Sequence, residues 1–66
     1  MPPDSDILEL YSLYKQATIG DVNIVKPTDA KGKSKWDAWN NRKGMNQVEA
    51  KKCYIDLAKN LASKYE

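Results

Sequence analysis

The chain has 66 residues, of which 41% are hydrophobic and 30% are charged, and this composition is typical of one small globular domain. A single cysteine, Cys53, and the absence of histidine exclude an internal disulfide and the usual zinc and cysteine–histidine catalytic sites. We therefore expect no enzyme activity, no metal and no cofactor. No apolar run approaches the length of a membrane span or a signal peptide, so we expect a cytoplasmic protein without an integral membrane segment.

The net charge of +2 is unevenly distributed along the chain. Residues 1–25 carry four acids and one base, whereas residues 26–43 carry six bases and two acids. A short basic centre of this kind favours a compact anionic ligand over a long nucleic acid, which usually requires a larger positive stripe.

The first predicted helix covers about residues 5–19. Asp4 and Asp6 precede or enter its first turn, where carboxylates stabilise the positive end of the helix dipole. Gly20 follows its end, in the left-handed position that glycine adopts without strain. At 100° per residue the apolar side chains form one wide arc. Three polar residues are expected to face away from this arc: Glu9, Ser12 and Gln16.

An extended loop is predicted next, because residues 21–28 contain β-branched side chains and a proline but no helical period. Either Thr28 or Asp29 can cap a second helix over about residues 30–42, which Gly44 ends. Trp36 and Trp39 lie on the apolar side of this helix and are expected to belong to the core.

Asn46 and Glu49 resemble a capping box and predict a third helix over about residues 46–64. Its apolar arc, which contains Cys53 and Tyr54, extends over more than half of its circumference, and we expect both residues in the core. Two helices with such wide arcs need more packing partners than three helices offer. A further helix, a second copy of the chain or an apolar ligand could cover them. The sequence thus predicts an all-α fold.

Tyr11 and Lys15 lie one helical turn apart, so an aromatic ring and an ammonium group share one edge of the first helix. One interpretation is a half-buried core tyrosine with a lysine that extends into water. The other is a site for an amphiphile, in which the ring packs on a ring or chain and the ammonium contacts a phosphate. Spacing alone does not decide between them.

Three lysines at the start of the second helix, Lys31, Lys33 and Lys35, oppose the positive end of the helix dipole. A bound phosphate would compensate these charges, although a solvated basic face is the simpler explanation. Lys31 and Lys35 share a face at i and i+4, whereas Lys33 points elsewhere.

Taken together, three stretches of the chain resemble the acyl-CoA-binding protein family, in the family's order and separation. The stretches are YSLYKQAT at residues 11–18 followed by Gly20-Asp21, KGKSKWDAW at residues 31–39, and YID at residues 54–56. The resemblance covers about residues 3–65, so the chain, residues 1–66, is expected to be one acyl-CoA-binding domain.

The resemblance implies a helical bundle, with three helices here of the family's four, and no catalysis. It also implies a carrier of medium- and long-chain acyl-CoA esters, with acyl-CoA as the ligand. Carried over by position, the ligand contacts would be Tyr11, Ser12, Leu13, Tyr14, Lys15, Lys31, Lys35 and Tyr54. By the same comparison Tyr11, Lys15 and Lys35 would lie near the 3′-phosphate of the CoA, and Tyr14 would stack near the adenine.

The chain departs from the family pattern in two ways. Family members begin with a further helix, whereas this chain begins just before the second family helix, so we expect uncovered apolar faces and a possible homodimer or helix exchange. The loop between Asp21 and Lys31 is shorter than the family's and replaces an apolar, methionine-containing stretch, which leaves the preferred acyl length open. The alternative function is therefore a shortened form that self-associates or binds a protein partner. A nucleic-acid binder is disfavoured by the acidic first segment.

Overall fold

The computed structural model describes residues 4–65, which form three helices and no strand. The helices are α1 (Asp4–Thr18), α2 (Ala30–Asn40) and α3 (Gln47–Tyr65). The all-α prediction is confirmed, and each predicted helix end lies within two residues of the observed one. Within the same residues no helix is both long and apolar enough to cross a membrane.

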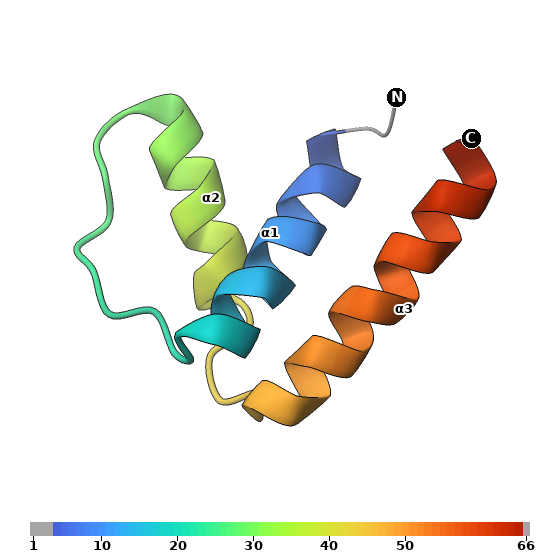
Figure 1. The fold of residues 1–66 in the computed structure, drawn as a ribbon. Coiled ribbons are helices and arrows are strands. Elements are labelled where there is room, and N and C mark those ends of the chain that lie inside the picture. The colour runs from blue at the N-terminus through green and yellow to red at the C-terminus, as the bar shows by residue number, and fades with distance from the viewer. Residues whose placement is uncertain (1–3, 66) are drawn as a thin grey trace.

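The central helix is α1, which packs against α2 on one side and α3 on the other (Figure 1). Over the described part of the chain α2 and α3 do not pack against each other. The molecule is consequently flat, with extents of 35 × 27 × 14 Å. Because a helix with its side chains is about 10–12 Å across, the slab is little thicker than one helix.

Local signals account for where the helices begin and end. Asp29 caps α2, since its side chain accepts a hydrogen bond of 2.8 Å from the Gly32 N–H. This decides between the two caps that the sequence allowed. Asn46 Oδ1 accepts a bond of 2.8 Å from the Val48 N–H at the start of α3. Gly20, with φ of 105°, follows α1 in the left-handed region that favours glycine.

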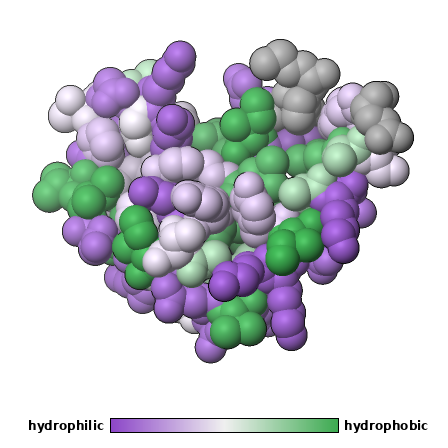
Figure 2. All heavy atoms as spheres, in the orientation of Figure 1, coloured by the Kyte–Doolittle hydropathy of each residue, from purple (hydrophilic) through white to green (hydrophobic). Residues whose placement is uncertain are grey.

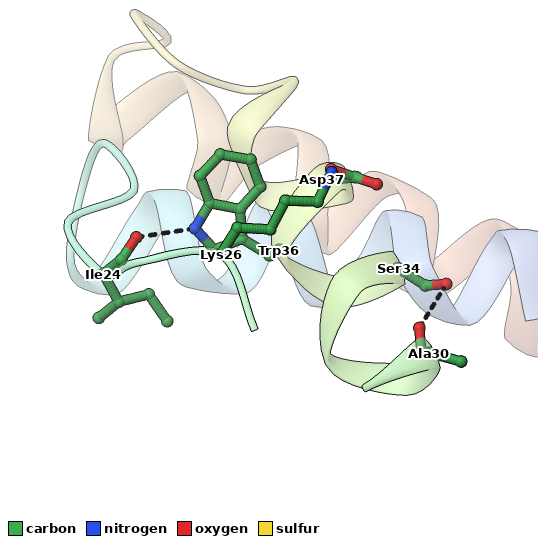
Figure 3. Close-up of polar contacts among 6 residues, drawn as sticks. All are labelled: Ile24, Lys26, Ala30, Ser34, Trp36 and Asp37. Carbon is green, nitrogen blue, oxygen red and sulfur yellow. Dashed lines mark hydrogen bonds and ion pairs between the residues drawn. The ribbon is translucent and has the colours of Figure 1, made fainter. Parts of the chain in front are cut away.

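The loop between α1 and α2 is extended, as predicted, and part of it is fastened along α2 (Figure 3). Trp36 Nε1 donates a hydrogen bond of 2.8 Å to the carbonyl of Ile24. Two residues farther on, Lys26 forms a salt bridge of 2.9 Å with Asp37 and places its ammonium 5.6 Å from the Trp36 ring centroid. These contacts leave Trp36 half-buried.

The buried apolar core is small and contains four residues: Leu13, Trp39, Ala50 and Leu61. Trp39 is the largest of them, and its ring is confirmed as a core element with 1% exposure. Its Nε1 donates a hydrogen bond of 2.7 Å to the Gly20 carbonyl at the end of α1. Cys53 and Tyr54, which were expected in the core, are half-buried because α3 has α1 as its one helical neighbour within the described residues.

The prediction that Ser12 and Gln16 face away from the core was wrong, because each is 1% exposed. The reason is that α1 is covered on two sides, so part of its polar face is buried as well. Ser12 Oγ donates to the Glu9 carbonyl at 2.7 Å and accepts from Arg42 Nε at 3.0 Å. Glu9 is exposed, as expected, and its carboxylate lies 3.6 Å from the Arg42 guanidinium.

Gln16 joins both connecting segments to α1. Its Nε2 donates to Asp21 Oδ1 at 2.9 Å and to the Met45 carbonyl at 2.8 Å. Asp21 Oδ1 also accepts the Gly44 N–H at 2.8 Å. The Gly44 bond, followed by the Gln16 bond and the charge of Lys43, holds the pKa of Asp21 below its ordinary value. This cluster fixes the exit from α1 against the turn that enters α3.

Candidate ligand-binding site

An open groove of about 380 Å³ lies between the first turns of α1 and the first turns of α2. Figure 2 shows the surface hollowed at its upper edge, between α2 and the beginning of α1. The lining residues are Asp4, Ile7, Leu8, Ala30, Lys31, Ser34 and Lys35. Apolar side chains from both helices therefore meet polar groups and two lysines in one groove.

Farther along α1, two lysines gather around aromatic rings. Lys15 Nζ lies 5.9 Å from the Tyr11 ring centroid and 5.2 Å from that of Trp39. Lys35 Nζ, which comes from α2, lies 5.5 Å from the same Tyr11 ring. These are cation–π distances. Tyr11 is consequently the point at which the basic residues of the two helices converge.

The charges of Lys15 and Lys35 have no carboxylate partner within residues 4–65. The two salt bridges of this part of the chain join other residues: Lys26 to Asp37 and Arg42 to Glu9. Two ammonium groups beside one aromatic ring repel each other unless an anion lies between them. The arrangement is therefore suited to a phosphate, with the apolar groove next to it.

The remaining aromatic residues of the predicted site lie between α1 and α3. Tyr14 is 52% exposed, and its ring centroid is 6.0 Å from that of the half-buried Tyr54, with an interplanar angle of 53°. Because Tyr14 directly precedes Lys15 on α1, the tyrosine pair adjoins the lysine cluster in the sequence of that helix. It offers an exposed aromatic face beside the cationic groups.

The model of the acyl CoA binding protein family matches residues 1–58 of the chain. The chain belongs to the acyl-CoA-binding protein family. It is 54% identical over 65 residues to a relative from a species of the genus Hypsibius that carries the family's name, and the match covers 96% of this chain and 73% of the relative. It also matches the crystal structure of Oryza sativa Acyl-CoA-Binding Protein 2 with a TM-score of 0.92 and 39% identity, over 97% of this chain and 73% of the rice chain. Family membership places the chain among binding proteins, not enzymes.

Within this acyl-CoA-binding domain the structure separates the predicted site residues into two groups. Ser12 and Leu13 are 1% and 3% exposed, so their side chains support the packing of α1 and do not line the groove. The other predicted residues retain exposed surface: Tyr11, Tyr14, Lys15, Lys31, Lys35 and Tyr54. Lys31 and Lys35 share the groove while Lys33 lies outside its lining, as their spacing predicted.

Sequence reasoning missed four groove residues of this acyl-CoA-binding domain: Asp4, Ile7, Leu8 and Ser34. A signal for them was present in the spacing. The first three follow the i, i+3, i+4 pattern on α1, and Ser34 completes the same pattern on α2 with Lys31 and Lys35. Two such patterns on adjacent helices indicate facing surfaces, but the sequence does not tell which helices are adjacent. No cluster of three or more metal-binding side chains occurs in the described residues.

Proposed function

We propose that the chain binds medium- and long-chain acyl-CoA esters and acts as a cytoplasmic carrier for them. The observation that supports this most is the apolar groove bordered by lysines whose charges lack carboxylate partners among residues 4–65. An acyl-CoA ester has the same division into an apolar chain and a phosphate-rich head. Family membership supports the same ligand class.

In this proposal the head group lies beside Tyr11. The ammonium groups of Lys15 and Lys35 donate hydrogen bonds to the 3′-phosphate, and the hydroxyl of Tyr11 joins them. Tyr14 stacks near the adenine, with Tyr54 beside it at 6.0 Å between ring centroids. Ser12 and Leu13 act from within the core, by fixing the α1 backbone that carries these side chains.

The acyl chain lies in the groove between α1 and α2 in the same proposal. Ile7 is 42% exposed and lines the groove together with Leu8, so a bound chain would cover apolar surface there. Each buried methylene contributes about 0.8 kcal/mol, so affinity rises with chain length until the groove is filled. Lys31 lies along this groove and reaches the part of the ligand that joins chain and head.

The proposal is tested by calorimetric titration of the protein with hexadecanoyl-CoA, free CoA and hexadecanoate in parallel. We expect the ester to bind far more tightly than either half, because the ester alone engages both the groove and the lysines. Equal affinity for the ester and hexadecanoate would contradict the role of the lysines. Equal affinity for the ester and free CoA would contradict the role of the groove.

Self-association is a second candidate, favoured by apolar surface on the flat sides of the slab. Tyr14, Val48 and Ile55 are 52%, 63% and 45% exposed on α1 and α3. A domain usually buries its core between two packed layers, whereas this one is 14 Å thick. A 35 × 27 Å face matches the roughly 800 Å² that each partner buries in a standard interface, so a second copy could supply the missing layer.

Sedimentation velocity over a range of protein concentrations distinguishes the two candidates. A monomer that binds hexadecanoyl-CoA one to one supports the carrier alone. A dimer that is indifferent to the ester supports self-association and contradicts the carrier proposal.

A further inference from the structure

Trp39 has a second contact besides its place in the core. Its ring is 1% exposed and anchored at Nε1 by the bond of 2.7 Å to the Gly20 carbonyl. The ring centroid lies 5.2 Å from Lys15 Nζ. A rigid buried ring from α2 thus contacts a lysine of α1 that belongs to the proposed head-group site.

This contact restricts a side chain that is otherwise mobile. A lysine ammonium sits at the end of four rotatable bonds and is strongly hydrated, so its position is poorly defined unless something holds it. Lys15 lies between two rings, at 5.2 Å from Trp39 and 5.9 Å from Tyr11. Tryptophan attracts a cation more strongly than tyrosine or phenylalanine, and burial fixes this ring in place. The Trp39 ring is consequently the stronger and more rigid of the two holds.

We propose that Trp39 is a positioning residue for phosphate recognition, whose ring holds the Lys15 ammonium where it contacts the phosphate of the ligand. The inference rests on the function proposed above and assigns a role to a buried residue that does not itself touch the ligand. It predicts that replacement of Trp39 weakens the contribution of the phosphate specifically, and does so only while Lys15 is present.

The chain contains a matched control for this contact. Trp36 also has a lysine ammonium over its ring, that of Lys26 at 5.6 Å. The charge of Lys26 is already paired with Asp37 at 2.9 Å. The Trp36–Lys26 pair lies on the loop side of α2, outside the proposed site. Replacement of Trp36 therefore removes a similar contact without changing the position of Lys15.

The test compares the affinities for hexadecanoyl-CoA and for its 3′-dephospho analogue, since their ratio measures the contribution of the phosphate. We expect Trp39→Phe to lower this ratio about two- to fivefold, the size of one cation–π contact, and Trp36→Phe to leave it unchanged. A purely structural role of Trp39 would weaken both ligands equally and leave the ratio intact, which would overturn the inference.

Two further measurements separate positioning from folding. In a Lys15→Ala protein, the additional Trp39→Phe change should leave the ratio as it is, and a further decrease would contradict the mechanism. Trp36→Phe protein that carries 5-fluorotryptophan at position 39 retains the ring shape and the Nε1 donor but has a weaker ring quadrupole. We expect a lower ratio there too, and an unchanged ratio would overturn the inference. Failure of the unmodified protein to bind either ester would refute the proposed function itself.

Discussion

Replacement of Lys35 by alanine is the most direct test of the head-group site, because Lys33 provides a matched control on the same helix. Both changes remove one positive charge from α2, so they alter the long-range electrostatic field equally. Lys35 lines the groove and lies 5.5 Å from the Tyr11 ring centroid, whereas Lys33 is outside the groove lining. Any difference between the two variants consequently reports a local contact.

The expected loss in Lys35→Ala is that of one charge-assisted hydrogen bond to phosphate, about 1.5–3 kcal/mol. Lys35 is exposed to solvent, which screens the contact, so the lower end of this range applies, or about tenfold in Kd. Lys33→Ala should change Kd by less than about twofold. Both are measured by titration with hexadecanoyl-CoA, with circular dichroism to confirm equal helix content. Equal losses in the two variants would show that lysine charge acts only through the overall field and would refute the site.

Three predictions concern the stability of the scaffold. Gly32→Ala should destabilise the protein by about 1 kcal/mol in urea unfolding, because its Cβ would lie 2.7 Å from Pro27 Cβ and disturb the cap of α2, which outweighs the better helix propensity of alanine; a more stable variant would contradict this. Asp21 has a lowered pKa in the folded state, so its contribution is present at neutral pH and lost as the pH falls below about 4. The stability difference between the unmodified protein and Asp21→Asn should thus shrink on acidification, and a difference that is constant between pH 7 and pH 3 would argue against the Gly44 hydrogen bond. Leu61→Ala should cost about 2–3 kcal/mol by thermal unfolding, since Leu61 is 8% exposed, and a cost below about 1 kcal/mol would show that α3 packs loosely.

The helices and their ends were predictable because their signals are local. Gly20 marks the end of α1, and Asn46 begins α3 through a hydrogen bond to a residue two positions away. Lys31 and Lys35 could be assigned to one face from their spacing alone. Such features depend on backbone geometry within one turn, which the sequence contains directly.

The burial of Ser12 and Gln16 could not be predicted, because it depends on partners far along the chain. Ser12 accepts from Arg42, thirty residues away, and Gln16 binds the carbonyl of Met45, which is twenty-nine residues away. A polar residue on a single helix is expected to face water unless a distant group satisfies it. The contact of Trp39 with Lys15 has the same origin, since it requires knowledge that α2 lies against α1.

The attachment of α2 to α1 depends on few contacts, and this has a consequence for ligand binding. Trp39 is the one fully buried side chain of α2, whereas polar and cation–π contacts provide much of its remaining attachment. A ligand that bridges Lys15 on α1 and Lys35 on α2 would therefore stabilise α2 more than α3. We expect hexadecanoyl-CoA to slow amide hydrogen exchange most strongly in residues 30–40. Uniform slowing over all three helices would instead indicate general stabilisation, without a bridge between α1 and α2.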